Sequence, residues 1–253
     1  CETGQIDRSN ELMAKSLAIN PRNANGAHFK SHAQYEGGEA VAGRSYLKSW
    51  LVDYDDRSLL HGHLSWHAAL WALQDGDIDA MWHVIDNGIG PSSSKGLPLA
   101  TLTDTAAILY RAKLAGVSVD PKRWSVLSDY AAKFFPETGQ SFADIHAALS
   151  HAMAGNGDRL AYIADTAKGF AGDLVKPVAR AWREIANENW AVALEELTIV
   201  MGQTERFGGS RAQRDILELT YANVLLKLGH SKEAHRYLST HRTILAKSPP
   251  LAG

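Results

Sequence analysis

The 253-residue chain has one cysteine, no long apolar run and no excess of basic residues. Cys1 cannot form an internal disulfide, and a chain with so little cysteine is typical of a reducing compartment, so we expect a cytoplasmic location. No segment reaches the roughly 18 apolar residues of a membrane-spanning helix. The net charge of −2 provides no basic surface for nucleic acid. We therefore expect neither a membrane nor a nucleic-acid partner.

The familiar catalytic signatures are also missing from the sequence. It contains no P-loop, no G-x-G-x-x-G, no C-x-x-C, no H-E-x-x-H and no G-x-S-x-G. These absences argue against the common nucleotide-binding, redox, metalloprotease and serine hydrolase classes. The composition, with 45% hydrophobic and 21% charged residues, is that of an ordinary globular protein.

What the sequence does contain is helical periodicity along almost its whole length, interrupted by glycine and proline at regular places. Short connections between helices favour antiparallel neighbours. A longer connection from Gly88 to Leu97 is either a surface loop near a ligand or a simple linker. The pattern predicts an all-α fold with helices at about 6–19, 24–37, 40–52, 58–75, 78–86, 99–115, 121–134, 141–154, 158–169, 174–187, 190–204, 211–228 and 231–245.

Two of these helices have well-marked starts. Ser210 and Gln213 form the pattern of a capping box, in which two side chains satisfy the first free backbone groups of a helix. Pro121 suits the first turn of a helix, and Asp120 precedes it as a candidate N-cap.

The clearest internal repeat is a pair of histidines. His28-x3-His32-Ala33 recurs as His63-x3-His67-Ala68, 35 residues later. A period near 34 is typical of tetratricopeptide hairpins, which must stack to bury their apolar faces. We therefore predict one domain over residues 1–253, a right-handed α-solenoid of tetratricopeptide-like hairpins. The helix at 6–19 lacks a preceding hairpin partner, which predicts further repeats upstream of Cys1. An alternative is that Cys1 is the acylated first residue of a lipoprotein.

The spacing of the histidines predicts where they point. Residues i and i+4 lie on one helical face, so each pair presents two neighbouring rings. If the repeats stack in register, both pairs come from first helices, which line the concave wall of a tetratricopeptide solenoid. Three interpretations of the four imidazoles stay open. They bind a divalent metal, they transfer protons or bind an anion, or they are packing residues.

Other polar residues also fall on predicted first helices. Asp104 and Arg111 are seven residues apart and share a helical face, which favours a buried ion pair. Asp144 and His151 have the same spacing, with His146 offset. We include Asp104, Arg111, Asp144 and His146 among the candidate groove residues. The tryptophans among alanine and leucine are expected in the core: Trp66, Trp71, Trp82, Trp124, Trp182 and Trp190.

The chain resembles the tetratricopeptide repeat protein 38 family. The likeness spans about residues 20–215 and depends on motifs in a common order: Asn20-Pro21, His28, His32, His63-x2-Trp66-His67-x2-Leu70, Asp104, Leu109-Tyr110-Arg111, Gly116-Val117-Ser118-Val119, Phe142-x-Asp144-x-His146 and Gly208-Gly209-Ser210-x-Ala212-Gln213-Arg214-Asp215. The resemblance implies helical repeats throughout and a longer parent protein. It implies no particular reaction.

We first expect a binding or scaffold protein that holds a peptide or a polar small molecule in its concave groove. The candidate lining residues are His28, His32, His63, His67, Asp104, Arg111, Asp144 and His146. The alternative is an enzyme in which His28, His32, His63 and His67 hold a divalent metal or act as acid and base, oriented by Asp104 or Asp144. A structural or homo-oligomerising role is a further alternative.

Overall fold

The structure is a computed structural model that describes residues 3–246, and every regular element in that range is a helix. The prediction of an all-α fold is confirmed. None of the described helices is both long enough and apolar enough to cross a membrane. Cys1 and the Pro249-Pro250 pair, which the sequence analysis singled out, lie outside the described residues.

The chain divides into two compact units, Cys1–Ile108 and Leu109–Gly253, which are described separately. The division falls inside a continuous helix, α6 (Pro98–Leu114). A helix interior carries none of the glycine, proline or polar runs that mark a linker, and the prediction of one domain over residues 1–253 stays a prediction.

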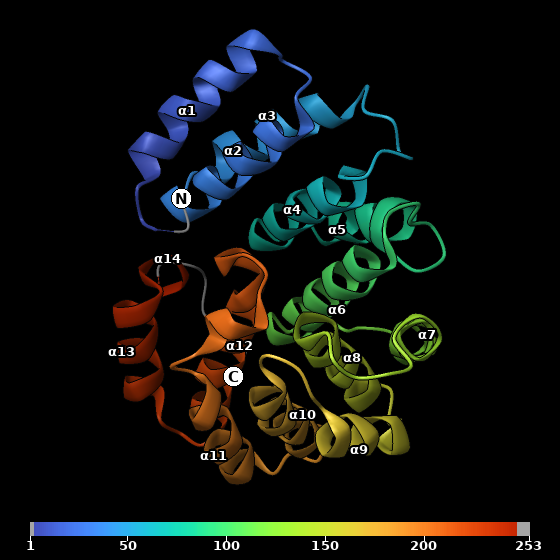
Figure 1. Ribbon diagram of the computed structural model, residues 1–253. Coiled ribbons are helices and arrows are strands. Elements are labelled where there is room, and N and C mark those ends of the chain that lie inside the picture. The colour runs from blue at the N-terminus through green and yellow to red at the C-terminus, as the bar shows by residue number, and fades with distance from the viewer. Residues whose placement is uncertain (1–2, 247–253) are drawn as a thin grey trace. The chain divides into compact units, whose positions relative to one another are not determined.

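The first unit contains five α-helices and a short π-helix before α6 (Figure 1). α2 packs against both α1 and α3, and α4 packs against α2, α3 and α5. Apolar side chains of these helices form its core, among them Leu47, Leu64, Trp66, Trp71 and Met81. The elements are α1 (Ile6–Ile19), α2 (Ala24–Gly37), α3 (Ala40–Leu51), α4 (His61–Gln74), α5 (Ile78–Val84) and the π-helix η1 (Ile85–Ile89).

Local signals fix both ends of α2. The side chain of Asn23 accepts a hydrogen bond from the Gly26 amide and caps the first turn. Gly38 adopts the left-handed conformation with φ of 72°, and the Glu39 amide donates back to the Gln34 carbonyl at 2.8 Å. A glycine in this conformation commonly ends a helix, and here the chain turns sharply from α2 into α3. The two caps leave α2 as a single helix on which His28 and His32 share a face.

A close contact between α3 and α4 sets the position of α4. Gly43 of α3 lies against the ring of Trp71, and a Cβ atom at this position would overlap that ring. Trp71 is 1% exposed. Because only glycine allows this approach, the contact holds α4 close to α3, one turn beyond His67.

In the described part of the chain, the second unit contains the rest of α6 followed by nine further helical elements (Figure 1). α8 packs against α7, α9 and α10, α10 against α9 and α11, and α12 against α11 and α13. The elements are α7 (Pro121–Phe134), α8 (Ser141–Met153), α9 (Gly157–Thr166), α10 (Gly172–Ala186), α11 (Trp190–Val200), the 3-10 helix η2 (Thr204–Phe207), α12 (Arg211–Lys227), α13 (Ser231–His241) and α14 (Thr243–Ala246).

Both predicted helix starts are confirmed. Ser210 and Gln213 form the complete capping box of α12. The Asp120 carboxylate accepts from the Lys122 amide, and Pro121 occupies the first turn of α7. These caps are local interactions between residues two or three apart, which is why the sequence alone predicts them.

Four of the six tryptophans expected in the core are buried, and the other two are partly exposed. Trp66, Trp71, Trp124 and Trp182 are buried, whereas Trp82 and Trp190 are only partly covered. Helical spacing places a side chain on a face, but it does not say how completely the next helix covers that face.

The predicted helix limits differ from the observed ones mainly at loops that have their own helical turns. α4 begins at His61 rather than near residue 58, and the helix expected over 190–204 ends at Val200 before the separate turn η2. Gly88, where the sequence predicted the start of an irregular connection, instead belongs to η1. The finer prediction of a right-handed tetratricopeptide-like solenoid stays a prediction.

Candidate metal centre

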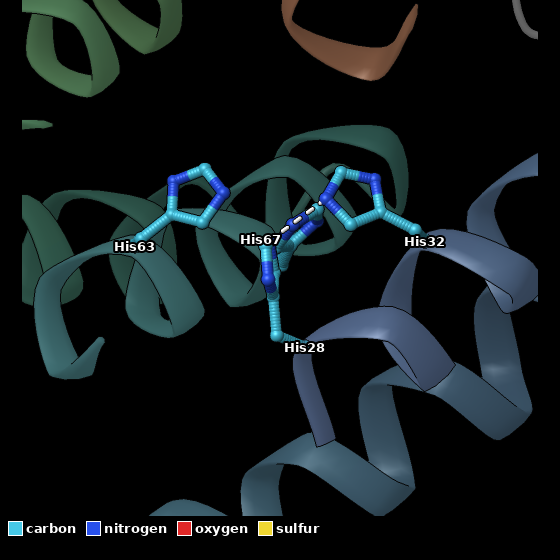
Figure 2. A group of neighbouring side chains, drawn as sticks. All are labelled: His28, His32, His63 and His67. Atoms are coloured by element: carbon cyan, nitrogen blue, oxygen red, sulfur yellow. Dashed lines mark hydrogen bonds between the residues drawn. The ribbon is translucent and has the colours of Figure 1, made fainter. Parts of the chain in front are cut away.

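Four histidines of the first unit point toward one another from two helices. α2 contributes His28 and His32, and α4 contributes His63 and His67 (Figure 2). α2 packs against α1 and α3, α4 packs against α3 and α5, and α2 and α4 also contact each other. The sequence-based prediction that the four rings converge is therefore met by the geometry.

The rings form a tight group. One ring nitrogen from each histidine can be chosen so that all four lie within 4.8 Å of one another. The centroids of the His28 and His32 rings are 4.5 Å apart, and those of His32 and His67 are also 4.5 Å apart. His32 and His67 are buried, whereas His28 and His63 are partly exposed. The group thus has a covered side and an accessible side.

The contact within α2 shows that at least one of its rings is a neutral acceptor. Nε2 of His28 lies 2.8 Å from Nε2 of His32, so one nitrogen carries a proton and donates while the other accepts. To bind one metal ion, the two rings would separate slightly and the donating ring would carry its proton on Nδ1.

Asp104 of α6 orients His63. Its carboxylate oxygen Oδ2 lies 2.9 Å from Nδ1 of His63, and Asp104 is 1% exposed. A carboxylate can only accept at neutral pH, so Nδ1 of His63 is the donor. Nε2 has a lone pair in the neutral form of the ring. A carboxylate behind a ring nitrogen is the usual arrangement that fixes the tautomer of a metal-bound histidine.

The charges of the group follow from burial and from Asp104. Burial lowers the pKa of His28 to about 4, and the nearby His63 lowers it further. Burial also holds the pKa of His32 well below its usual value, with the two neighbouring histidines adding to the effect. Burial acts in the same direction on His63, but the charge and hydrogen bond of Asp104 outweigh it and raise the pKa. His28 and His32 are therefore neutral near pH 7, as metal ligands must be, whereas the raised pKa of His63 favours its charged form, so metal binding there releases a proton.

The spacing of the nitrogens suits a metal ion. Zinc–imidazole distances of about 2.0–2.1 Å place the nitrogens of a tetrahedral site about 3.3 Å apart. The observed upper limit of 4.8 Å means that the widest pair would approach by about 1.5 Å, the difference between the two values. The four residues therefore fit a single ion.

Two tryptophans of α4 support the rings of the same helix. The indole of Trp66 stacks on His63 with centroids 5.2 Å apart and an angle of 16° between the planes. Trp71 lies one turn beyond His67, with ring centroids 6.3 Å apart. The sequence analysis assigned both tryptophans to the core and missed this role. The sequence contained a signal for this role, because Trp66 follows His63 by three residues and Trp71 follows His67 by four, which places each pair on one helical face.

The other predicted groove residues make separate contacts. Arg111 does not pair with Asp104, since its guanidinium donates to the Ala212 carbonyl at 2.5 Å. The predicted ion pair between Asp104 and Arg111 is wrong, because Asp104 bonds His63 instead. Sequence spacing put the two side chains on one face of α6 but could not show which helix each one meets.

Asp144 and His146 of α8 have local partners within the second unit. The Asp144 carboxylate accepts from the Gly139 amide at 2.9 Å, near the start of the helix. Nδ1 of His146 donates to the Phe142 carbonyl at 2.7 Å, and its ring packs edge-on against Phe142. These contacts provide hydrogen-bond partners for the Gly139 amide, near the start of α8, and for the Phe142 carbonyl. A ligand-binding role for Asp144, His146 and Arg111 stays a prediction.

Comparison with known proteins gives no independent assignment. No family model and no solved structure matches the chain. The resemblance to the tetratricopeptide repeat protein 38 family therefore stays a prediction from the motifs quoted above, and the case for function depends on the geometry of the site.

Proposed function

We propose that this protein binds one divalent transition-metal ion through His28, His32, His63 and His67. The observation that carries the proposal is the convergence of four ring nitrogens within 4.8 Å from two helices, with Asp104 behind His63. Imidazole nitrogens favour zinc, copper, iron and nickel over magnesium or calcium, which prefer oxygen ligands.

The alternative of four packing residues is less consistent with the chemistry. Buried polar groups are normally surrounded by fixed donors and acceptors. Here His28 and His32 face each other instead, and the Asp104 carboxylate bonds His63. A cation in the middle would accept all the lone pairs that converge there. The metal is thus the partner that the arrangement supports best.

The first experiment titrates wild-type protein, stripped with a chelator and dialysed, with zinc chloride in a calorimeter. We expect one zinc ion bound per chain, and the same ratio by elemental analysis after gel filtration. Wild-type protein that takes up no zinc, copper, nickel or iron would overturn the proposal. Because this measurement uses the unaltered chain, it does not depend on any variant folding.

A matched pair of variants then tests the ligands. His67→Ala removes a buried member of the cluster, whereas His83→Ala removes an exposed histidine of α5 that bonds Asn87. We expect His67→Ala to lose stoichiometric zinc and His83→Ala to keep it. Circular dichroism of both variants shows whether the helices persist. Equal zinc binding by the two variants would contradict the assignment of ligands.

A role as a peptide-binding or small-molecule-binding scaffold, and a role of the metal in catalysis, stay predictions. Metal binding is compatible with either one. In both cases the partly exposed rings of His28 and His63 mark the side from which a further ligand would approach.

A further inference from the structure

The histidine cluster of the first unit provides no negative charge for an ion that it binds. Its four members bind a metal as neutral imidazoles (Figure 2). The Asp104 carboxylate contributes one negative charge, held behind His63 by their hydrogen bond. A divalent ion and this carboxylate together leave a charge of about +1. Because His32, His67 and Asp104 are buried, water screens that charge poorly. A monoanion bound beside the ion would offset it.

The cluster is accessible from one side only. His28 and His63 are partly exposed, whereas His32 and His67 are buried, so a further ligand reaches the ion past His28 and His63. The side chain of His63 is 11% exposed, which admits a small group such as a carboxylate. Carboxylate oxygens bind zinc at about 2.0–2.2 Å, nearly the same distance as imidazole nitrogens, and zinc can take five ligands.

An exposed aromatic ring lies next to the accessible side. Phe29 follows His28 on α2, and its ring stacks on that of His28 with centroids 5.5 Å apart and an angle of 29° between the planes. Phe29 is 48% exposed. An apolar group that covered this ring would gain from the removal of apolar surface from water. The accessible side therefore combines an ion that attracts an anion with an apolar surface.

On the basis of the proposed metal site, we infer that the loaded cluster binds a small monocarboxylate with an apolar body. The carboxylate is a further ligand of the ion and offsets its remaining charge, and the apolar body lies on Phe29. A phosphate dianion would reverse the charge of the site instead of offsetting it. A neutral amide would leave the charge in place, and a halide would gain nothing from Phe29.

The test uses cobalt(II), whose visible absorption changes with its ligands, whereas zinc has a filled d shell and is colourless. The full chain, stripped with a chelator, is loaded with cobalt and titrated with phenylacetate, formate or the neutral phenylacetamide. We expect a saturable change with phenylacetate, a change at higher concentration with formate, and none with phenylacetamide. Equal changes with phenylacetate and phenylacetamide, or no change with phenylacetate at millimolar concentration, would overturn the inference.

Failure of the inference and failure of the metal site give different results. A wild-type chain that binds neither zinc nor cobalt would overturn the proposed function and the inference with it. A chain that binds one cobalt ion, but whose absorption is the same with and without phenylacetate, would overturn the inference alone.

A matched pair of variants tests where the apolar body lies. Phe29→Ala and Phe134→Ala remove two phenyl rings of similar exposure, 48% and 41%, and Phe134 belongs to α7 in the second unit. We expect Phe29→Ala to weaken phenylacetate binding about two- to tenfold, the range for one aromatic contact. Formate binding should stay unchanged, since formate has no body to place on the ring. Phe134→Ala should bind both acids as the wild type does. An undiminished preference for phenylacetate over formate in Phe29→Ala would contradict the inferred position of the ligand.

Discussion

Two groups of buried histidines, one in each unit, use the same residue type in different ways. In the first unit, His28 and His32 face other imidazoles. In the second unit, His146 and His151 of α8 bond fixed acceptors or donors of the protein, the Phe142 carbonyl and the Ser128 hydroxyl. Burial lowers the pKa of both His28 and His151 to about 4. Burial and pKa alone therefore do not distinguish a metal site from a packing residue.

The two groups of histidines differ in the atoms that their ring nitrogens face. Nδ1 of His146 and Nδ1 of His151 each meet a separate partner, and among the described residues neither histidine belongs to a group of three or more converging metal-ligand side chains. The rings of α2 and α4 point into a shared space, and a carboxylate holds His63 from behind. The comparison teaches that the direction of the lone pairs, more than the number of histidines, marks the candidate metal centre.

The largest expected effect comes from removing the metal. If zinc is present at roughly 1,000 times its Kd, it stabilises the folded state by about 4.1 kcal/mol, which raises the Tm of a chain this size by about 8–16 °C. His63→Ala should abolish the increase, and His146→Ala should keep it. Differential scanning calorimetry with zinc and with a chelator measures the shift. An equal zinc-dependent shift in both variants would remove the distinction between the two groups.

The second effect is a pH dependence from His151. Its folded-state pKa of about 4 lies below the ordinary value of 6.5, so the unfolded chain binds the proton more readily. The stability that this neutral ring contributes is complete above pH 6.5 and is lost as the pH falls toward 4, by about 3 kcal/mol in all. Urea unfolding at several pH values should show a shallower loss for His151→Gln than for the wild type. His83→Gln serves as the exposed control and should follow the wild-type curve.

The third effect concerns the carboxylate behind His63. Asp104→Asn keeps the size of the side chain but removes its charge, and loss of such a partner typically weakens metal binding about 10–100-fold. Asp144→Asn, at the start of α8, should leave zinc affinity unchanged. Calorimetric titration of the two variants compares them directly. If Asp104→Asn binds zinc as tightly as the wild type, Asp104 does not orient a ligand.

The smallest effect tests the packing behind the site. Gly43→Ala places a methyl group against Trp71 and should destabilise the fold by about 1–3 kcal/mol, the usual cost of overpacking. Gly202→Ala, where an added Cβ would meet no atom within 4 Å, is the control in the second unit. Denaturant unfolding gives both values. A Gly43→Ala protein as stable as the Gly202→Ala protein would show that α4 can shift away from α3.

Sequence reasoning predicted the local features well. The caps at Ser210 and Asp120 depend on residues two or three apart, and the shared face of each histidine pair depends on the helical period alone. The π-helix η1 was missed because its hydrogen bonds skip one residue more than those of an α-helix, and no residue pattern marks that change.

The helical character of the chain, the position of most helices and the recurrence of a histidine pair 35 residues later can all be read from the residues alone. These features arise from interactions within a single turn or a single helix. The contact of Asp104 with His63 rather than Arg111, and the approach of α4 to α3 at Gly43, become visible only once the helices are packed. Such contacts join residues tens of positions apart, and their partners depend on how whole helices pack.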